Sequence, residues 1–274
     1  MSEDKRILSW MSIPERTSKP RTTGLNMVVA VHNAIEGMNM LQDLVSWAGD
    51  YIDYYKMGTE MRLQPREAVL KRLAFLHENG IAAYAPGGVA GKAAQQGCID
   101  LCLDELKELK FSAVEASRIV LTMPQMLEVI RKGQERRLRV FAEVGQKHIG
   151  WEGGPKSHMS AADVIGEMRT LLNAGAFKIV YEFTETVSLL KEKRGLEALL
   201  EMVVAVGKDN IMLEVPANAV GTWDEISRYT VLFINHFGPN VNLGNVSPDH
   251  IMGVEKLRHS FSAINTLGKR SSPQ

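Results

Sequence analysis

The stretch AVEASRIVLTMPQMLEVIRKGQERRLRVFAEV, residues 113–144, contains one complete strand–helix–strand unit. Apolar runs typical of strands lie at 113–116 and 138–144, and between them a helix-like run at 124–136 begins with a proline, which favours the first helical turn. A strand, a helix and a second strand in this order indicate two parallel strands joined by a crossover helix. The rest of the chain repeats this order.

The alternation predicts eight strands and eight helices. The expected strands are 25–31, 51–57, 81–84, 113–116, 138–144, 177–181, 210–214 and 241–243. The expected helices are 36–48, 65–78, 92–109, 124–136, 160–173, 188–206, 222–236 and a last one from 248 onward. Eight such units predict a single-domain α/β protein of the (β/α)₈ or TIM barrel class. An open doubly wound sheet is the alternative, but its glycine triplet is absent after the first strand.

The two ends of the chain differ from this central region. We expect residues 1–18 to form an N-terminal extension, 19–262 the barrel and 263–274 a polar tail. The opening residues lack the apolar core of a secretory signal. No run reaches the roughly 18 apolar residues of a membrane span. We therefore expect a cytoplasmic protein that does not contact membranes.

The composition excludes several classes of function. The chain has 32 Lys and Arg against 32 Asp and Glu, so it lacks the basic surplus of a nucleic-acid-binding protein. Hydrophobic residues make up 45%, which is typical of globular proteins and argues against disorder. Cys98 and Cys102 are too few for a four-cysteine zinc site, and we expect both to be buried.

Acidic side chains end four of the expected strands: Glu115, Glu143, Glu182 and Glu214. In a barrel of this class the carboxyl ends of the strands carry the active site. Carboxylates that converge there must be protonated, paired with a lysine or neutralised by a cation. Lys56 and Lys147 are the expected lysines, and Mg²⁺ prefers oxygen ligands. The alternative for each glutamate is that it caps the following helix or pairs with a surface arginine.

Two glycine-containing loops are candidate anion sites. Residues 87–92, GGVAGK, are similar to a phosphate-binding loop but are one residue short, and Ala93 stands where a metal-binding Ser or Thr is required. This excludes the nucleotide interpretation, although backbone amides at a helix start can still bind phosphate. Residues 237–245 surround the last strand, where barrels commonly bind phosphate. The alternative for this second loop is a structural turn.

From this loop outward the chain resembles the phosphosulfolactate synthase family, over roughly residues 19–260. The run FGPNVNLGNV at 237–246 is similar to the family signature. Other similar segments are Lys19-Pro20-Arg21, GDYID at 49–53 with Lys56, Pro86-Gly87-Gly88, Glu115 with Ser117, Glu143-Val144-Gly145 with Lys147, and Glu214 with Pro216.

The resemblance implies a (β/α)₈ barrel that adds sulfite to phosphoenolpyruvate with Mg²⁺, a carbon–sulfur lyase of coenzyme M biosynthesis. It implies Glu143, Glu182 and Glu214 as metal ligands. It implies Lys147, Lys56 and Glu115 as catalytic residues, with Lys147 protonating C2 of the substrate. The implied residues for binding a small anionic substrate are Arg21, Gly87, Gly88, Ser117, Asn242, Gly244 and Asn245. Arg118 departs from the family pattern, and we expect it to bind the substrate in place of a lost positive charge. We also expect a homo-oligomer.

The chain departs from the family pattern in four loops, at 30–31, 89–92, 118–119 and 183–186, where anion-binding or acidic residues are replaced. Three hypotheses therefore stay open. The first is a synthase of the family type. The second is a divergent paralogue acting on another enolate-forming phosphorylated or carboxylated acid. The third is a non-catalytic barrel, and the family's plant relatives, linked to heat tolerance, indicate that the fold can persist with altered sites.

Overall fold

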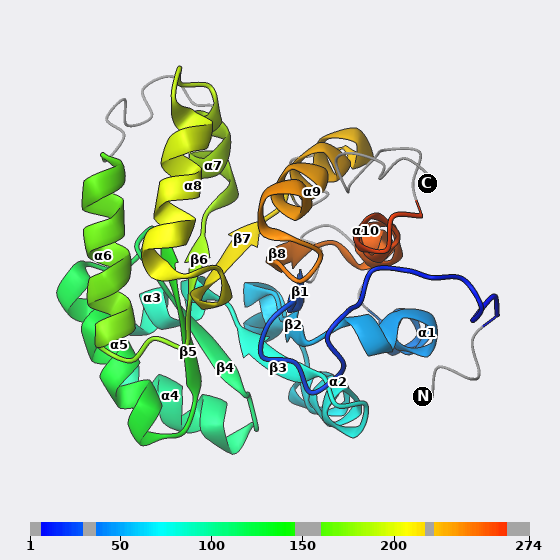
Figure 1. Cartoon of the computed structure of the whole chain (residues 1–274). Helices are drawn as coiled ribbons and strands as arrows, with labels where there is room; N and C mark the ends of the chain where they lie inside the picture. The colour runs from blue at the N-terminus through cyan, green and yellow to red at the C-terminus, as the bar shows by residue number, and fades with distance from the viewer. Residues whose placement is uncertain (1–6, 30–36, 146–159, 217–221, 262–274) are drawn as a thin grey trace, which may run out of the picture.

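A computed structural model of the chain forms a closed barrel of eight parallel strands surrounded by helices (Figure 1). The structure describes residues 7–29, 37–145, 160–216 and 222–261. The strands follow one another around the barrel in chain order, which confirms the predicted (β/α)₈ barrel. They are β1 (Asn26–Val29), β2 (Tyr54–Lys56), β3 (Ala82–Ala85), β4 (Ala113–Ser117), β5 (Arg139–Val144), β6 (Lys178–Tyr181), β7 (Ile211–Glu214) and β8 (Asn242–Val246).

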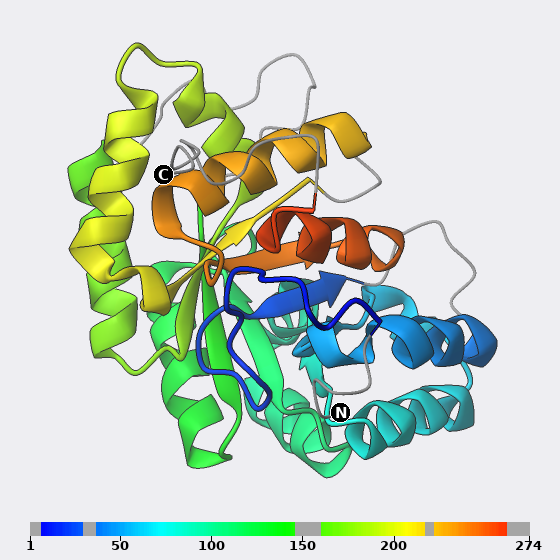
Figure 2. The ribbon, with the colours of Figure 1, turned by 45° about the vertical axis from the view of Figure 1, so that its right-hand side comes forward.

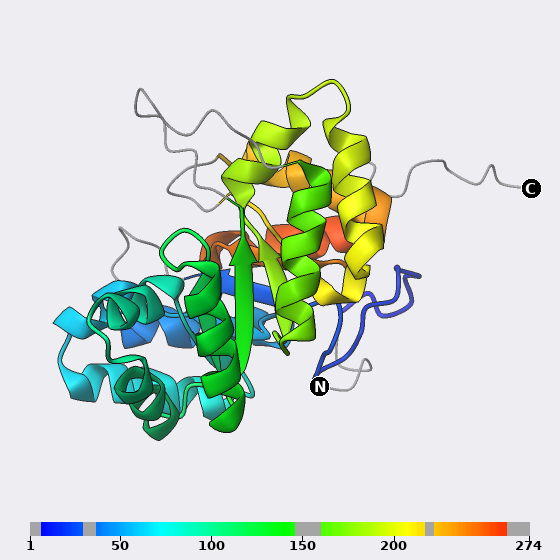
Figure 3. The same ribbon diagram turned by 90° about the vertical axis from the view of Figure 1, so that its left-hand side faces the viewer.

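Helices cover the outside of this barrel. They are α1 (Met38–Ala48), α2 (Arg66–Glu78), α3 (Gly87–Gln95), α4 (Ile99–Glu108), α5 (Met123–Glu135), α6 (Ala161–Asn173), α7 (Phe183–Leu190), α8 (Gly195–Val206), α9 (Trp223–Phe237) and α10 (Ile251–Arg258). Short 3₁₀ turns lie at Gly49–Tyr51, Thr59–Leu63, Lys208–Asn210 and Pro248–His250. In Figure 1, α4, α5 and α6 lie on one side of the barrel and α1 and α2 on the other. Figure 3 shows β5 between α5 and α6, which pack against it.

Local sequence signals begin some of these helices where we expected. Thr122 and Gln125 form a capping box at the start of α5, in which the Gln125 side chain accepts the Thr122 backbone N–H at 2.9 Å. Thr222 and Glu225 form the same arrangement at α9, also at 2.9 Å. Each box provides hydrogen-bond partners for amides that a helix start leaves without them. The strand-to-helix alternation is thus set locally as well as by packing.

Two of the expected helices are each divided in two. The run expected at 92–109 forms α3 and α4, because Gly97 takes a φ of +67° and ends the first helix. Cys98 and Cys102, expected to be buried, are half-buried at the start of α4. The run expected at 188–206 likewise forms α7 and α8.

The inside of the barrel is a packed core. Tyr54, Tyr84 and Phe141 meet edge to face, with ring centroids between 4.9 and 6.3 Å apart. A separate and larger core lies between the sheet and the helices. Because the interior is filled, a ligand has to bind at one end of the barrel. The inner core cluster consists of Leu25, Met27, Tyr54, Tyr84, Ala113, Phe141, Val180 and Met212.

The segment before β1 runs past the amino end of the barrel, beside α10 (Figure 2). Arg16 forms an ion pair with Glu255 of α10 at 3.0 Å, and the Thr17 backbone N–H donates to Asn240 at 3.2 Å. Contact with the barrel therefore begins within the 18 residues that we expected to form an extension. The expected tail lies outside the described residues. No helix in the described part of the chain is long and apolar enough to cross a membrane.

Candidate functional site

Three glutamates meet at the carboxyl ends of the strands. Glu115 on β4, Glu143 on β5 and Glu214 on β7 are each at most 3% exposed, and each offers an oxygen within 4.8 Å of the others. Strand periodicity explains the convergence, since residues two apart face the same side of a sheet. Two positions before each glutamate stands a member of the inner core cluster: Ala113, Phe141 and Met212 respectively.

Lys56, at the end of β2, joins these acids. Its ammonium lies 2.7 Å from Glu115 and 3.9 Å from Glu214. Burial alone lowers the pKa of Lys56, but the charges of Glu115, Glu214 and Glu143 outweigh burial and raise the pKa above 10.5. Lys56 is therefore a charged ammonium at neutral pH. We call Lys56 and the three glutamates the mouth cluster.

Glu115 is fully paired within the mouth cluster. Besides Lys56, the Tyr84 hydroxyl donates to it at 2.7 Å and the Gly87 backbone N–H at 2.9 Å. Burial raises the pKa of Glu115, but the Lys56 ion pair and these hydrogen bonds outweigh burial and lower the pKa below 4.5. Tyr84 is a site residue that the sequence analysis missed, although its place near the end of a buried strand is a signal that could have found it.

Glu214 is more weakly paired than Glu115, because the Lys56 ammonium lies 3.9 Å from it and 2.7 Å from Glu115. Burial raises the pKa of Glu214 well above 4.5, and although Lys56 opposes this, the charges of Glu143, Glu182 and Glu115 add to the increase. Within the described residues its buried Oε1 accepts no hydrogen bond. Without a cation, burial and the neighbouring acids thus favour the protonated form of this carboxyl more than water does.

The Ser117 hydroxyl orients Glu143. It donates a short hydrogen bond to the Glu143 carboxylate, and the register of β4 and β5 places the two residues side by side. Gly87, the first residue of α3, packs closely against Glu115 and Ser117. A Cβ atom there would lie 2.8 Å from both Glu115 Oε1 and Ser117 Cβ, so only glycine allows the helix to approach this closely.

The residues present fit a divalent cation. Three carboxylates offer oxygen atoms at one point, and the Glu214 oxygen there lacks a hydrogen-bond donor. An all-oxygen donor set suits Mg²⁺, which binds few protein ligands and keeps several waters. The predicted metal ligands Glu143 and Glu214 are therefore brought together, with Glu115 as a third acid.

A cavity of about 230 Å³ opens beside the mouth cluster. Of the predicted residues, Lys56, Gly87, Gly88, Glu115, Ser117, Glu143 and Asn245 line it. Asn245 has a left-handed φ of +54°, and its Oδ1 is buried without a hydrogen-bond partner among the described residues. Asparagine tolerates this conformation better than most residues. The cavity is also lined by side chains that the sequence analysis missed: Val29, Met57, Thr59, Pro86, Ile119 and Val120.

Three other predicted residues surround the cavity without lining it. Gly244 pairs with Glu214 in the sheet, and a Cβ there would lie 3.3 Å from Glu214 Cγ, so its place is one of close packing. Glu182 does not join the other acids, because its carboxylate caps α7 and accepts the Glu185 backbone N–H at 3.0 Å. Arg118 instead meets Glu167 of α6 at 3.3 Å.

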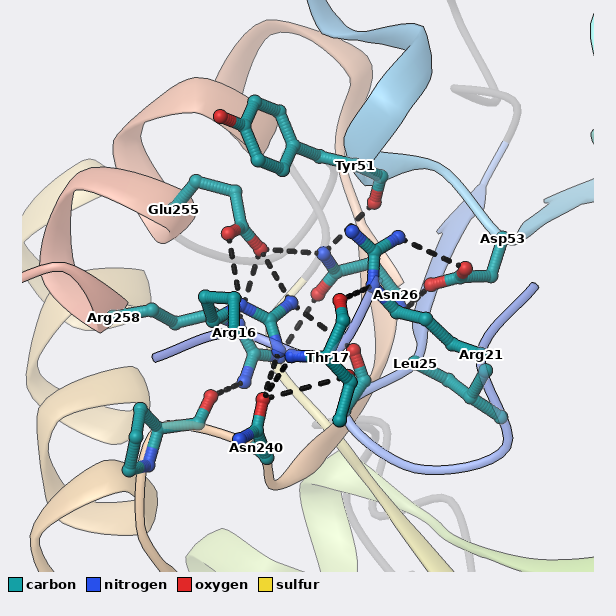
Figure 4. A network of polar contacts seen from close by, with 12 residues as sticks. Arg16, Thr17, Arg21, Leu25, Asn26, Tyr51, Asp53, Asn240, Glu255 and Arg258 are labelled. Carbon is teal, nitrogen blue, oxygen red and sulfur yellow. Dashed lines mark hydrogen bonds and ion pairs between the residues drawn. The ribbon is translucent and has the colours of Figure 1, made fainter. Parts of the chain in front are cut away.

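Arg21 and Asn242, both predicted to bind substrate, lie at the opposite end of the barrel. Arg21 donates to Asp53, just before β2, at 3.1 Å (Figure 4). Asn242 is the first residue of β8 and accepts the Leu25 backbone N–H at 3.0 Å. The last strand was expected at 241–243, which placed Asn242 near its carboxyl end; the strand in fact starts at Asn242 and continues to Val246. Both residues therefore serve the structure of the amino end.

Figure 4 shows a second set of buried charges at this amino end. Glu255 accepts hydrogen bonds from Arg16 at 3.0 Å and Asn26 at 2.7 Å, and Arg258 lies 3.3 Å from it. We call these four residues, with the Arg21–Asp53 pair, the amino-end network. The sequence analysis missed its centre, because a glutamate near the chain's last helix gives no signal by itself.

The run FGPNVNLGNV is split between the two ends. The Asn240 side-chain oxygen accepts a hydrogen bond from the Arg16 guanidinium, and the Pro239 carbonyl accepts one from Arg258. Asn245, five residues after Asn240, lines the cavity. The first half of this run therefore matches the structural turn that we kept as its alternative. Lys147, the predicted acid, lies outside the described residues.

Comparisons with known proteins agree with the resemblance. The family model described as (2R)-phospho-3-sulfolactate synthase matches residues 14–263. Phosphosulfolactate synthase of Methanothermobacter thermautotrophicus is 25% identical over 93% of this chain and 96% of its own. That of Methanocaldococcus jannaschii is 27% identical over 84% and 89%. Protein HEAT-STRESS-ASSOCIATED 32 of Arabidopsis thaliana is 26% identical over 91% of each chain.

Proposed function

The chain belongs to the phosphosulfolactate synthase family, and on that premise we propose that it is a metal-dependent enzyme acting on a small acid that forms an enolate. One observation carries the proposal. Three buried glutamates share one ammonium, and no hydrogen bond from the described residues reaches one oxygen of the Glu214 carboxyl. Buried acids in surplus are costly unless a cation or substrate completes them.

The reference reaction is the addition of sulfite to phosphoenolpyruvate. The sulfur lone pair forms a bond to C3, the electron pair of the double bond moves toward the carboxylate, and a proton is then added at C2. The phosphate ester stays intact. Glu115, Glu143 and Glu214 would hold a divalent ion, which would supply positive charge where negative charge builds on the carboxylate. Lys147 stays the predicted donor of the proton to C2.

The chain's own residues orient this site. Glu115, which accepts a hydrogen bond from the Tyr84 hydroxyl, fixes the Lys56 ammonium, whose positive charge would attract the substrate carboxylate. Ser117 holds Glu143 in place, since its hydroxyl donates to that carboxylate. The aromatic rings of the inner core cluster close the barrel beneath and exclude water from that side.

A second candidate, the same chemistry on a different acid, is favoured by the helix starts beside the cavity. Amides at a helix start commonly bind phosphate. Here the Glu115 carboxylate accepts a hydrogen bond from the first backbone amide of α3. The Glu182 carboxylate accepts one from the Glu185 backbone amide of α7. Two of the places where a phosphate would bind are thus taken by the protein's own carboxylates. The non-catalytic barrel stays the third hypothesis, and the plant relative is named for heat stress and not for an enzyme activity.

Incubation with phosphoenolpyruvate, sulfite and Mg²⁺ tests the proposal, with the product followed by ³¹P NMR. We expect a phosphosulfolactate signal that EDTA abolishes and that Lys147→Ala reduces by more than tenfold while circular dichroism stays unchanged. No product, together with Mg²⁺-dependent binding of another carboxylate, favours the second candidate. If neither Mg²⁺ nor any carboxylate binds, the enzyme proposal is wrong. A cytoplasmic location and a homo-oligomer are also proposals, and light scattering of the purified protein tests the second.

A further inference from the structure

Tyr84 contacts both members of the closer of the two ion pairs that Lys56 forms. Its hydroxyl donates to Glu115 Oε2 at 2.7 Å, and the Lys56 ammonium reaches the same oxygen, also at 2.7 Å. The ammonium lies over the Tyr84 ring, 5.6 Å from its centroid, within the range of a cation–π interaction. One fully buried tyrosine therefore touches the acid with its hydroxyl and the ammonium with its ring face.

Packing inside the barrel fixes the orientation of Tyr84. The residue lies on β3 and pairs with Lys56 in the register of β2 and β3. Its ring meets Tyr54 and Phe141 edge to face, at centroid distances of 6.3 and 4.9 Å. Protein interiors are close-packed, so a ring in such surroundings keeps one orientation. The hydroxyl is thus held against Glu115 by the core beneath the cavity.

Three donors hold the Glu115 carboxylate. The Gly87 backbone N–H donates to Oε1 at 2.9 Å, while Lys56 and Tyr84 share Oε2. With both oxygens held, the carboxylate does not rotate without breaking a charge-assisted hydrogen bond. The ammonium bound to it consequently stays 3.9 Å from Glu214, although Glu214 is also an acid.

The position of this ammonium matters because it competes with a metal for the same acids. A divalent ion at the mouth cluster and the Lys56 ammonium repel each other, and the repulsion grows as the distance between them falls. An ammonium shared midway between Glu115 and Glu214 would take up the carboxylate oxygen that a cation needs. An ammonium kept on Glu115 leaves the Glu214 oxygen open.

We infer that Tyr84 is a positioning residue of the metal site: through Glu115 it holds the Lys56 ammonium away from Glu214, which leaves that carboxylate to the cation. The inference rests on the proposed function, since it requires a divalent ion at the mouth cluster. Loss of the Tyr84 hydroxyl frees Glu115 Oε2 to turn about its remaining bond to the Gly87 amide. The ammonium then moves toward Glu214, and an incoming cation meets a closer positive charge.

Isothermal titration calorimetry of the full-length protein with MgCl₂, and with MnCl₂ as a second probe, tests the inference. Tyr84→Phe keeps the ring and removes the hydroxyl. We expect it to weaken metal binding by roughly tenfold, the size of effect that residues supporting metal ligands have. Tyr54→Phe is the matched control, because it removes a hydroxyl from the same core at its amino end, where Arg139 donates to it at 2.6 Å. This control should stay within twofold of the parent, and urea unfolding checks that both variants fold.

A double-mutant cycle with Lys56→Met separates the ammonium from a general loss of structure. Lys56→Met alone should tighten metal binding, because it removes the competing charge. In that background Tyr84→Phe should change the metal affinity by less than twofold, since no ammonium is left for the hydroxyl to hold in place.

The outcomes separate this inference from the function on which it rests. Metal binding by Tyr84→Phe within twofold of the parent overturns the inference and leaves the metal-dependent enzyme standing. A tenfold loss that Tyr54→Phe shares, or that persists in the Lys56→Met background, also overturns it, because the effect then does not pass through the ammonium. Weaker binding by Lys56→Met overturns it as well. If the parent binds neither ion, the inference and the metal dependence of the proposed function are both wrong.

Discussion

The two ends of the barrel bury acidic side chains in opposite ways. In the mouth cluster three glutamates share the single ammonium of Lys56, and a cavity opens beside them. In the amino-end network two acids, Glu255 and Asp53, meet three arginines. The surplus of acid at one end is suited to binding a cation, whereas the arginine-paired acids at the other end join distant parts of the chain.

The pKa values of one acid at each end express this difference. Burial raises the pKa of Glu255, but Arg258, Arg16 and the Asn26 hydrogen bond outweigh it and lower the pKa below 4.5. Burial raises the pKa of Glu214 far above 4.5, and Lys56 does not compensate. At similar depth, the pKa of the acid at the amino end is therefore lowered and the pKa of the acid at the mouth is raised.

The largest expected effect is that of Glu255→Ala. The substitution leaves the buried Arg258 and Arg16 without their carboxylate, and breaking a buried ion pair in this way costs about 3–5 kcal/mol. Urea unfolding at pH 7 measures the loss. Glu255→Gln, which keeps the shape and one acceptor, should lose less. A stability within 1 kcal/mol of the parent for the alanine variant would contradict a structural role for the network.

Glu143→Gln should act on cation binding and not on stability. Loss of one of three carboxylates should weaken Mg²⁺ or Mn²⁺ binding by roughly 100-fold, about 2.7 kcal/mol. Mutation of residues that only support the metal ligands already lowers metal affinity by roughly 10–100-fold. Because the substitution also removes charge repulsion among the buried glutamates, the free energy of unfolding should stay unchanged or rise. Titration calorimetry measures the affinity. Glu182→Gln is the matched control: it should leave metal affinity intact, and equal weakening in both variants would argue against the assigned triad.

Arg21→Ala tests whether this residue belongs to the amino end alone. It removes the hydrogen bond to Asp53, so we expect the free energy of unfolding to fall by about 1.5 kcal/mol. Metal affinity and carboxylate binding should stay within twofold of the parent. A tenfold loss of carboxylate binding without loss of stability would return Arg21 to the substrate site.

The smallest effect is a pH dependence of stability in the metal-free protein. Because the folded pKa of Glu214 is raised, its contribution is fully present below pH 4.5 and is lost as the pH rises through the folded pKa. The stability of the parent relative to Glu214→Gln should therefore decline with rising pH. The stability of the parent relative to Glu255→Gln should instead decline as the pH falls below 4.5, because the folded pKa of Glu255 is lowered. Chemical unfolding from about pH 2 to pH 9 measures both, and slopes of equal sign would refute the contrast.

Strand periodicity and topology made part of the site predictable. A glutamate two residues after an inward apolar residue has to face the barrel axis near the strand end, which holds for Glu115, Glu143 and Glu214. The same rule places Lys56 after Tyr54. Topology also carried a signal that we did not use. Arg21 precedes the first strand, and a residue before a strand lies at the amino end of a parallel barrel.

Other features depend on packing that a single sequence does not reveal. Glu182 also follows an inward residue, Val180, but lies just beyond the end of β6 and caps α7, and local spacing does not decide between a ligand and a cap. Gly244 follows the last strand as we expected it, at 241–243, yet β8 continues through this residue. A Cβ atom there would lie 3.3 Å from Met212 Cγ and Glu214 Cγ, so the glycine allows close packing. The pairing of Arg16 with Glu255 spans 239 residues, far beyond any local pattern.

That long separation has a consequence for the order of events during synthesis. During synthesis Arg16 is made 239 residues before Glu255, and Asn26 is made 232 residues before Arg258. Until β8 and α10 have been made, Arg16 and Asn26 lack these partners and β1 lacks its neighbour β8. The barrel therefore closes only after these late elements appear, and the earlier strands need protection from misassociation in the meantime.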